Sequence, residues 1–394
     1  MTDYILQHDS SKCYGCRACE QICPQKAITM QPNEEGFLYP VLDETICIKC
    51  GLCSQICPIN TDFFDSDGVQ RVYAAQYKQE ASLMNSSSGG VFSAAADYVL
   101  NHGGAVAGCI FDENFTAVHK VSQNPDTIAK MRGSKYVQSD MGHTFLDIKK
   151  RLEDGQLVLF TGTPCQVDGL NRFLRKKYDN LYTLDLICHG VPSPALFSEY
   201  LKYAEQKKGS ITDIKFRNKK RNGWCSQGSI SHSHAGKTKI RTTSPYNDSY
   251  YYYYYLQNNI SRMCCYSCKY STVHRVGDLT IGDYWNVNDV LPSLDISKGI
   301  SVVLVNNGQG QKLIERIKDK LLLLETDLSS AVKGNGNLSK PCKLPESRKE
   351  IYQRIKEQGY AAITKQDCQY QHLIPFLRKH TPKAVKRFLK KVRH

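Results

Sequence analysis

The chain has 394 residues, of which 41% are hydrophobic and 23% are charged, and its net charge is +14. This length predicts two or three domains, and the apolar content excludes a disordered chain. The sequence has no run of about 18 apolar residues, which excludes a membrane-spanning helix.

The charge is distributed unevenly along the chain. Residues 1–58 contain seven acids and four bases, so this segment carries −3 and the rest of the chain carries +17. A basic surface can bind nucleic acid or acidic substrates, but most basic surfaces are simply solvated. Residues 1–11 lack the basic and apolar regions of a secretory leader, so we expect a cytoplasmic protein.

The N-terminal segment contains a repeated cysteine motif. Eight of the 17 cysteines fall within the first 57 residues, in two C-x-x-C-x-x-C-x-x-x-C-P runs offset by 34 residues. In a reducing compartment such clustering favours metal ligation over disulfides. The two runs are Cys13, Cys16, Cys19 and Cys23, followed by Pro24, and Cys47, Cys50, Cys53 and Cys57, followed by Pro58.

This spacing is typical of chains that hold two 4Fe-4S clusters. Three closely spaced thiolates bind three irons of one cube, and the fourth cysteine of each run binds the other cluster. Zinc sites usually take separated C-x-x-C pairs, so iron–sulfur is favoured over zinc. Residues 1–60 therefore resemble a bacterial two-cluster ferredoxin, a one-electron relay. The expected ligand sets are Cys13, Cys16, Cys19 and Cys57 for one cluster, and Cys47, Cys50, Cys53 and Cys23 for the other.

Beyond residue 60, a polar linker at 61–72 is expected to lead into a larger domain at 73–345. Apolar periodicity and turn residues predict both helices and strands there. In chain order they are a helix at 91–100, a strand at 105–111, a short helix capped by Asn124, a helix at 141–152, a strand at 157–160, a helix from about Gln166, a strand at 181–187, a strand at 299–306 and a helix at 311–317. The larger domain should therefore be mixed α/β. The six tyrosines at 250–255 fit a half-buried strand or a ring-packed helix better than a stacking platform for substrate.

Seven motifs occur in one order along the larger domain. They are Ser87-Ser-Gly-Gly90, Gly133-Ser-Lys-Tyr-Val137, Phe160-Thr-Gly-Thr-Pro-Cys-Gln166, Cys188-His-Gly-Val-Pro-Ser193, Phe216-Arg217 with Gly223-Trp224, Cys265-Tyr-Ser-Cys268, and Gly277-Asp-Leu-Thr-Ile-Gly-Asp-Tyr-Trp285. Over about residues 10–305 the chain resembles the family of coenzyme F420 hydrogenase/dehydrogenase beta subunits, in its form with an N-terminal ferredoxin module. The resemblance implies a mixed α/β (α+β) fold in which a ferredoxin-like module precedes a larger flavin-binding domain.

The cofactor implied by the resemblance is FAD, and three loops have residues suited to binding it. Small residues before a helix present amide N–H groups to an anion such as a pyrophosphate, although they more often form an ordinary helix cap. A lysine and a tyrosine near Gly133 can serve phosphate or the flavin ring, or form a plain turn. The third loop follows a strand, a usual ligand position in α/β sheets. The candidate residues are Ser87, Ser88, Gly89, Gly90, Ser134, Lys135, Tyr136 and Thr163.

Nine cysteines lie outside the ferredoxin-like segment. Cys165 and Cys188 follow two neighbouring predicted strands, so we expect them to face one cavity. Cys265 and Cys268 supply two more thiolates, and four thiolates suffice for a third 4Fe-4S cluster. Cys264 competes with Cys265, but the family pattern Arg-x-x-Cys-Tyr-x-Cys favours Cys265. Of the other cysteines we expect Cys109 in the core and Cys342 and Cys368 in structural or surface positions.

Residues 346–394 are expected to form a helical basic tail. After Asp367 the chain has eight bases and no acid, and apolar residues recur at helical spacing within 382–393. Such a helix can lie at the surface of an anionic membrane or bind an acidic partner. Packing of its apolar side on the body of the protein is an equal alternative.

These features predict an iron–sulfur flavoprotein oxidoreductase that passes electrons between 4Fe-4S clusters, FAD and a two-electron carrier or substrate. The expected partners are a redox protein or low-potential donor and a small-molecule substrate, and no nucleic acid is expected. One alternative is an F420-specific reductase or dehydrogenase subunit. Another is a non-catalytic electron relay, or a nucleic-acid-binding protein that uses the basic body. His189 and His274 are weak candidates for proton donors.

Overall fold

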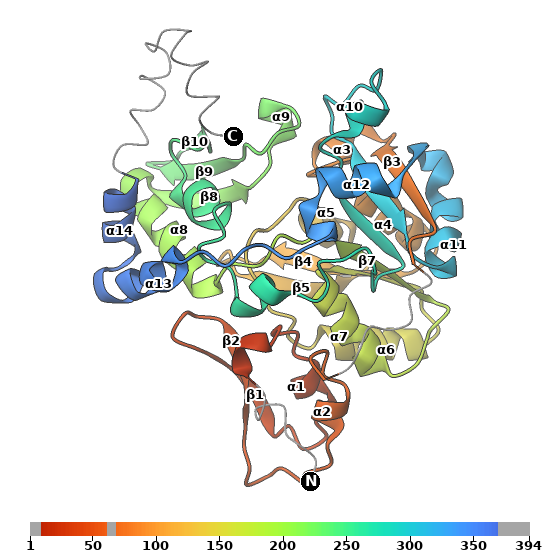
Figure 1. The fold of residues 1–394 in the computed structure, drawn as a ribbon. Coiled ribbons are helices and arrows are strands. Elements are labelled where there is room, and N and C mark those ends of the chain that lie inside the picture. The colour runs from red at the N-terminus through yellow and green to blue at the C-terminus, as the bar shows by residue number, and fades with distance from the viewer. Residues whose placement is uncertain (1–8, 61–67, 369–394) are drawn as a thin grey trace.

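The structure is a computed structural model that describes residues 9–60 and 68–368 (Figure 1). Most of the predicted linker at 61–72 lies outside the described residues, and its last two residues belong to the first strand of the larger domain. The predicted basic helix within 382–393 also lies outside them. None of the described helices is long and apolar enough to span a membrane.

The N-terminal module, residues 9–60, is small and has little apolar core. Its elements are η2 (Ser10–Lys12), α1 (Ala18–Ile22), β1 (Ile28–Pro32), β2 (Leu38–Leu42) and α2 (Leu52–Gln55). The two strands pair antiparallel, with Ile28 opposite Leu42. Cys19, Cys57 and Ile28 form the buried centre of the module. A module of this size cannot fold on so small a core alone, so bound clusters are expected to contribute to its stability.

The larger domain is built on one mixed sheet of eight strands. They are β3 (Arg71–Tyr77), β4 (Ala105–Phe111), β5 (Ala117–Ser122), β6 (Val158–Gly162), β7 (Leu181–Leu186), β11 (Leu279–Asp283), β12 (Ser301–Val305) and β13 (Leu321–Thr326). The order is β13-β3-β12-β11-β7-β6-β4-β5. Adjacent strands among β4, β6, β7 and β11 run parallel, and the other pairs are antiparallel. β12 is therefore an antiparallel neighbour of both β11 and β3.

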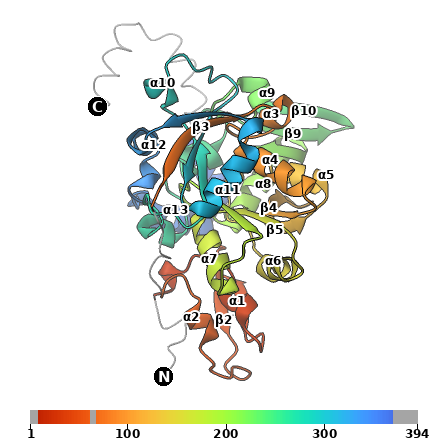
Figure 2. The same cartoon turned by 90° about the vertical axis from the view of Figure 1, so that its right-hand side faces the viewer.

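Helices cover both faces of this sheet (Figures 1 and 2). One face packs against α4 (Val91–Asn101), α5 (Pro125–Met131) and α11 (Gly308–Ile317). The other packs against α6 (Thr144–Glu153) and α7 (Pro164–Leu174), and nearer β3 against α10 (Val287–Val290), α12 (Leu328–Gly334) and η6 (Gly336–Leu338). Both faces must be covered because apolar side chains alternate along the strands. In β3, Val72 and Ala74 pack into one core, and Tyr73 and Ala75 pack into the other. Two short helices, α3 (Glu80–Met84) and η5 (Lys318–Lys320), flank β3 and β13.

Between β7 and β11 the chain leaves the sheet and builds a second lobe. Its elements are α8 (Pro194–Lys208), β8 (Ser210–Lys215), α9 (Lys219–Asn222), β9 (Ser229–His234), β10 (Lys237–Thr242), η3 (Tyr250–Tyr255) and η4 (Met263–Ser267), joined by α13 (Ser347–Gln358) and α14 (Tyr360–Asp367). Strands β8, β9 and β10 form a separate antiparallel sheet. The tyrosine run is a π-helix with five buried rings, which confirms the ring-packed helix and not the strand.

Most predicted elements of the sheet region are found with small shifts. The strand at Ala105–Phe111 has the predicted bounds, and the Asn124 side chain caps α5 by accepting from two backbone amides. α7 begins two residues earlier than predicted, because Thr163 is the N-cap, Pro164 is the first helical residue, and Thr163 and Gln166 form a capping box. α6 begins three residues later, because Gly142 has φ +45° in a turn in which Asp140 accepts its N–H.

The module lies against the end of the larger domain that carries α6 and α7 (Figures 1 and 2). Gln21 accepts hydrogen bonds from the backbone amides of Phe145 and Leu146, at the start of α6. At Gly169 in α7, an added Cβ would lie 3.0 Å from the sulfur of Cys16. The glycine thus allows close approach of the predicted cluster ligands to the larger domain.

Candidate iron–sulfur and cofactor site

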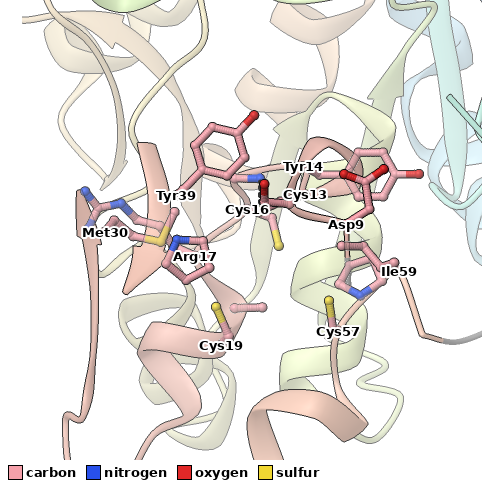
Figure 3. Close-up of a pocket in the computed structure, with 15 residues that line it drawn as sticks. Asp9, Cys13, Tyr14, Cys16, Arg17, Cys19, Met30, Tyr39, Cys57 and Ile59 are labelled. Carbon is pink, nitrogen blue, oxygen red and sulfur yellow. Dashed lines mark hydrogen bonds between the residues drawn. The ribbon is translucent and has the colours of Figure 1, made fainter. Parts of the chain in front are cut away.

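The first predicted ligand set is gathered in the module. Cys13, Cys16, Cys19 and Cys57 line one cavity of ≈ 30 Å³. Figure 3 shows the sulfur atoms of Cys16, Cys19 and Cys57 facing a common space. Burial raises the pKa of Cys16, and the neighbouring Cys57 and Cys13 raise it further. Four thiols from two distant runs therefore meet here, as ligation of one cluster requires.

The second predicted set lies nearer the surface of the module. The pKa of Cys53 is raised by burial and then by Cys50 and Cys23, which places these three thiols together. Cys47 accepts a hydrogen bond from the Lys49 amide, and Cys50 is exposed. A cluster held by this set would lie close to the protein surface, where another protein can approach it.

The third predicted set lies at the carboxyl ends of the parallel strands. Cys165 is in the first turn of α7, directly after β6, and Cys188 follows β7. Cys265 lies in η4, and Cys268 follows it. Burial raises the pKa of Cys165, and Cys268, Cys188 and Cys265 raise it further. The fold thus brings together four cysteines that are up to 103 positions apart in the sequence.

Two further cysteines adjoin the third set. A hydrogen bond from the Cys264 thiol lowers the pKa of Cys265, although burial opposes it. The Cys342 thiol donates to the carbonyl oxygen of Cys265 at 3.7 Å. Sequence reasoning assigned Cys342 no place near the site, since no motif surrounds it.

The donor sets fit iron–sulfur clusters. In each set one sulfur accepts a hydrogen bond from the amide two residues later, at 3.4 Å for Cys13, Cys47 and Cys188. Such bonds to ligand sulfurs tune the potentials of iron–sulfur clusters. Among residues 9–60 and 68–368, no three Cys, His, Asp or Glu side chains converge on a single metal ion. The thiolates of a cube bind different irons, so they do not meet at one point.

A cavity of ≈ 690 Å³ opens at the carboxyl ends of β6 and β7. This volume lies within the range of cofactor sites. Gly89 does not line it, because it is packed so that an added Cβ would lie 2.0 Å from the Ala75 carbonyl oxygen and 2.5 Å from the Ser301 amide. The seven other predicted cofactor residues all line it, namely Ser87, Ser88, Gly90, Ser134, Lys135, Tyr136 and Thr163.

Two of the three predicted cofactor loops are joined beside the cavity. Ser87 Oγ accepts hydrogen bonds from the amide of Ser134 at 2.8 Å and from its hydroxyl at 3.0 Å. Gly90 has φ +80° and is the N-cap of α4, whose first residues Val91 and Phe92 line the cavity. The first turn of a helix has amide groups without partners inside the helix, so this wall is suited to an anion.

Lys135 lines the cavity, but its ammonium group is engaged elsewhere. Nζ donates to four backbone carbonyl oxygens near the end of α5, those of Lys130 at 2.7 Å and of Met131, Arg132 and Gly133 at 3.1 Å each. Burial lowers the pKa of Lys135 to about 8. In this arrangement Lys135 caps a helix, and a contact with phosphate would require the ammonium to leave those carbonyl groups.

Further polar groups line the cavity, and of these the sequence singled out only His189 as a weak candidate for a site residue. His119 Nε2 contacts the Thr161 carbonyl oxygen at 3.1 Å, His189 Nδ1 contacts Asn337, and Arg217 pairs with Asp283 at 3.1 Å. Within the described part of the chain, His119 Nδ1, His189 Nε2 and two nitrogens of Arg217 are buried without a hydrogen-bond partner. A bound polar ligand would fit these groups.

Sequence signals for the lining residues are uneven. His189 and Arg217 stand in the quoted motifs, whereas His119 lies on β5 with no motif around it. Cys109, expected in the core, is only partly buried and also lines the cavity. His274 is exposed and does not line it.

The third cysteine set lies between the module and the cavity. Cys188 lines the cavity, and Thr163 Oγ1 is 3.2 Å from the Cys165 sulfur. On the other side, Tyr14 follows Cys13 in the module. Burial raises the pKa of Tyr14, and Cys268, Cys264 and Cys165 of the larger domain raise it further. The surface set, the inner set of the module, the third set and the cavity therefore follow one another.

Three segments of the chain match described protein families. Residues 12–61 match a 4Fe-4S dicluster domain. Residues 72–145 match the N-terminal part of the coenzyme F420 hydrogenase/dehydrogenase beta subunit, and residues 155–330 match its C-terminal part. Together these last two segments cover more than half of the chain. The cysteines and loops described above fall within the matched segments, apart from Cys342.

Individual relatives are distant. The coenzyme F420-dependent sulfite reductase of Methanocaldococcus jannaschii is 28% identical over 49% of this chain, and the match spans 30% of the relative's length. One component of the F(420)H(2) dehydrogenase of Methanosarcina mazei is 22% identical over 82% of this chain and 86% of its own length. A chain of the F420-reducing [NiFe] hydrogenase complex from Methanosarcina barkeri is 15% identical, with 73% of this chain and 92% of that chain covered and a TM-score of 0.47. The chain thus belongs to the family of coenzyme F420 hydrogenase/dehydrogenase beta subunits and carries an N-terminal 4Fe-4S dicluster domain.

Proposed function

We propose that the protein is an iron–sulfur flavoprotein oxidoreductase. Two clusters in the dicluster domain exchange single electrons with a redox partner protein. A third 4Fe-4S cluster on Cys165, Cys188, Cys265 and Cys268 connects them to FAD in the ≈ 690 Å³ cavity, where a small molecule exchanges two electrons. The observation that carries this proposal is the succession of thiol sets from the surface to the wall of that cavity.

The residues of the chain support the proposal in distinct ways. The Ser87 and Ser134 loops and the first turn of α4 provide hydroxyl and amide groups for the cofactor. His119 donates from Nε2 to the Thr161 carbonyl, so Nδ1 is left as a proton acceptor in the cavity wall. FAD, when bound, would supply the ability to store two electrons and release them singly.

The experiment that tests this function is identification of the cofactor in full-length protein purified without oxygen. Denaturation should release about one FAD per chain. Gly336 lines the cavity, and a side chain added there would meet no atom within 4 Å of its Cβ, so Gly336→Phe should fill cavity space and lower flavin content several-fold. Gly308 is equally open at the start of α11, away from the cavity, so Gly308→Phe is the matched control.

The outcomes separate the candidate functions. Release of FAD that Gly336→Phe reduces and Gly308→Phe does not would support the proposal. Protein that is fully loaded with iron but releases no flavin would contradict it. That result would favour an electron relay without a catalytic centre.

A second candidate function is an F420-specific reductase or dehydrogenase, in which the deazaflavin is the hydride partner. The family description and the names of the two curated relatives favour it. Bleaching of the flavin by reduced F420, but not by NADH or NADPH, would support this assignment. Equal bleaching by a nicotinamide, with no response to reduced F420, would exclude it.

A further inference from the structure

Arg262 is a fully buried arginine at the boundary between the module and the larger domain. Among the described residues, Arg262 has the largest side chain that is fully buried. It directly precedes η4, the segment that carries Cys265. Burial of a guanidinium is costly unless the charge is paired and every donor is satisfied, so its surroundings should reveal what compensates it.

The partners of the Arg262 guanidinium are neutral. It donates to the carbonyl oxygens of Cys13 at 2.7 Å and Leu38 at 3.0 Å, and to the side-chain oxygen of Gln138 at 3.0 Å. Its centre lies 4.0 Å from the ring of Tyr39. Within residues 9–60 and 68–368, no carboxylate forms an ion pair with Arg262.

Two predicted cluster sets adjoin Arg262. Its side chain contacts the Cys13 carbonyl group, and its main chain contacts the Cys265 amide. Cys13 belongs to the inner set of the module, and Cys265 belongs to the third set. A cluster bound by four thiolates is an anion, so clusters at these two sets would supply the missing countercharge.

Arg262 is also bonded to the segments that carry both sets. Its side chain holds the Cys13 carbonyl group, and its own carbonyl oxygen accepts from the Cys265 amide at 2.9 Å. Its amide donates to Val191, three residues after Cys188. Gly15 passes so close that an added Cβ would lie 3.1 Å from the guanidinium. Arg262 is therefore fixed between the two sets from both sides.

We propose that Arg262 controls electron transfer between the inner cluster of the module and the cluster of the larger domain. This inference rests on the proposed third cluster. One electron leaves one cluster and reduces the other, and no proton or bond is exchanged. Arg262 remains a cation throughout, because a guanidinium does not deprotonate in proteins. Its fixed charge stabilises the added electron on either cluster. Its hydrogen bonds fix the distance between the two clusters.

A purely structural role for Arg262 makes different predictions. If it only joined the two parts of the protein, neutral substitutions would lower stability without changing cluster potentials. If its charge acts on the clusters, loss of the cation should make reduction harder. Arg262→Lys keeps the charge and loses the planar fork, whereas Arg262→Met removes both.

A matched control exists at the same boundary. Arg348 is also buried and also connects the two parts, but Glu35 neutralises it through a two-point ion pair, with distances of 2.8 and 2.6 Å. The double variant Arg348→Met with Glu35→Gln therefore removes a bridging pair without changing the total charge. It reports what loss of a structural contact does by itself.

The test is a redox titration of the anaerobic full-length protein, with each cluster followed by its electron paramagnetic resonance signal. At a fixed potential near the wild-type midpoint, Arg262→Met should lower the ratio of reduced to oxidised cluster about tenfold, which for one electron is 59 mV. Arg262→Lys and the double control should stay within about threefold, on the same constant. Unchanged midpoints in Arg262→Met with full iron would overturn the proposal.

Loss of iron in a variant is also decisive. If Arg262→Met loses iron while Arg262→Lys retains it, the charge is required at this position. Equal iron loss in both variants would overturn the electrostatic role. If wild-type protein shows only two clusters, the proposed third cluster fails, whereas the effect of Arg262 on the inner cluster of the module remains measurable.

Discussion

At the scale of single residues, the third cysteine set predicts a specific iron content per chain. Burial raises the pKa of both Cys165 and Cys188 above that of a free thiol, so without metal these groups are protonated. Metal binding requires the thiolate and displaces its proton. The iron–sulfur bonds must therefore offset the free energy of removing those protons. Under anaerobic conditions we expect the thiols to stay reduced and bound to iron.

Single cysteine substitutions should therefore remove iron in units of one cluster. Three clusters imply about 12 Fe per chain and two imply about 8. Cys165→Ser or Cys268→Ser should lower the content from about 12 to about 8 Fe, because one ligand of the third set is lost. Cys109→Ser is the control, since Cys109 lines the cavity but belongs to no predicted set. Unchanged iron in both ligand variants would remove these cysteines from the site.

The buried His119 should make stability depend on pH. Burial and, to a smaller extent, the nearby Lys135 lower its pKa to about 4, although the hydrogen bond to Thr161 and the charge of Asp140 oppose the shift. The unfolded chain, with an ordinary pKa of about 6.5, binds the proton first as pH falls. Stability is therefore complete above about pH 6.5 and is lost toward pH 4, by about 2 kcal/mol between pH 7 and pH 5.

The measurement is anaerobic urea unfolding at pH 7 and pH 5. His119→Gln keeps a donor for the Thr161 carbonyl group and should reduce the difference in unfolding free energy by most of that amount. His274→Gln, at an exposed histidine, should leave the difference as in wild type. The same acid sensitivity in His119→Gln as in wild type would contradict the assignment.

The sequence revealed some residues of the site better than others. Ligand cysteines were visible because cluster binding demands a rare residue at fixed spacing, and the fold groups the four cysteines of the inner set, the four of the third set, and Cys23, Cys50 and Cys53 of the second set. His119 and Cys342 provided no signal, because each reaches the site through contacts with residues more than 40 positions away. Lys135 was visible as a cation, but its position over the end of α5 depends on backbone geometry.

At the scale of elements, local chemistry predicted the sheet region well. Asn124 before Pro125 fixed the start of α5, and the apolar run from Ala105 fixed β4. The tyrosine run remained ambiguous, because six identical residues have no period that separates strand from helix. Its π-helical form is set by the core of the second lobe, where Tyr250 packs on Phe197 and Tyr200. Those partners belong to α8, so no local pattern could reveal them.

Helix α7 makes an element-scale prediction through Gly169. This glycine stands inside a helix, where it costs roughly 1 kcal/mol relative to alanine, so a packing reason is expected. The reason is the 3.0 Å approach of a hypothetical Cβ to the Cys16 sulfur. Gly169→Val should displace the inner set of the module and lower iron content by about 4 Fe.

Two measurements check that prediction. Iron analysis of Gly169→Val reports the loss, and circular dichroism shows whether α7 is still folded. Gly308→Val at the open start of α11 is the control and should retain all of its iron. Full iron with an unchanged resonance signal in Gly169→Val would show that α7 does not constrain this cluster.

At the scale of the whole molecule, the placement of the module is the feature that sequence could not predict. Its contacts join residues far apart in the chain, such as Arg262 with Cys13 and Arg348 with Glu35. Each is one hydrogen-bonded pair among many polar side chains and has no periodicity. The division into a cysteine-rich module and a mixed α/β domain was predictable, because composition and element order differ between them.

The basic tail gives a prediction about association of the whole chain. Its eight bases after Asp367 have no acid among them, and a cationic amphipathic helix binds anionic lipid surfaces. Full-length protein should float with vesicles containing anionic lipid at low salt, whereas a chain ending near Gln371 should not. Vesicles of neutral lipid are the control. Equal flotation of both chains would show that the tail does not carry membrane binding.

Metal and cofactor stoichiometry tests whether three clusters lead to one flavin in this protein. Full-length protein is purified without oxygen, and iron, acid-labile sulfide and released flavin are measured on the same sample. Three clusters and one flavin would give about 12 Fe, about 12 sulfide and about one FAD per chain. A content of about 8 Fe with no flavin, in protein whose dicluster domain is fully loaded, would contradict this arrangement.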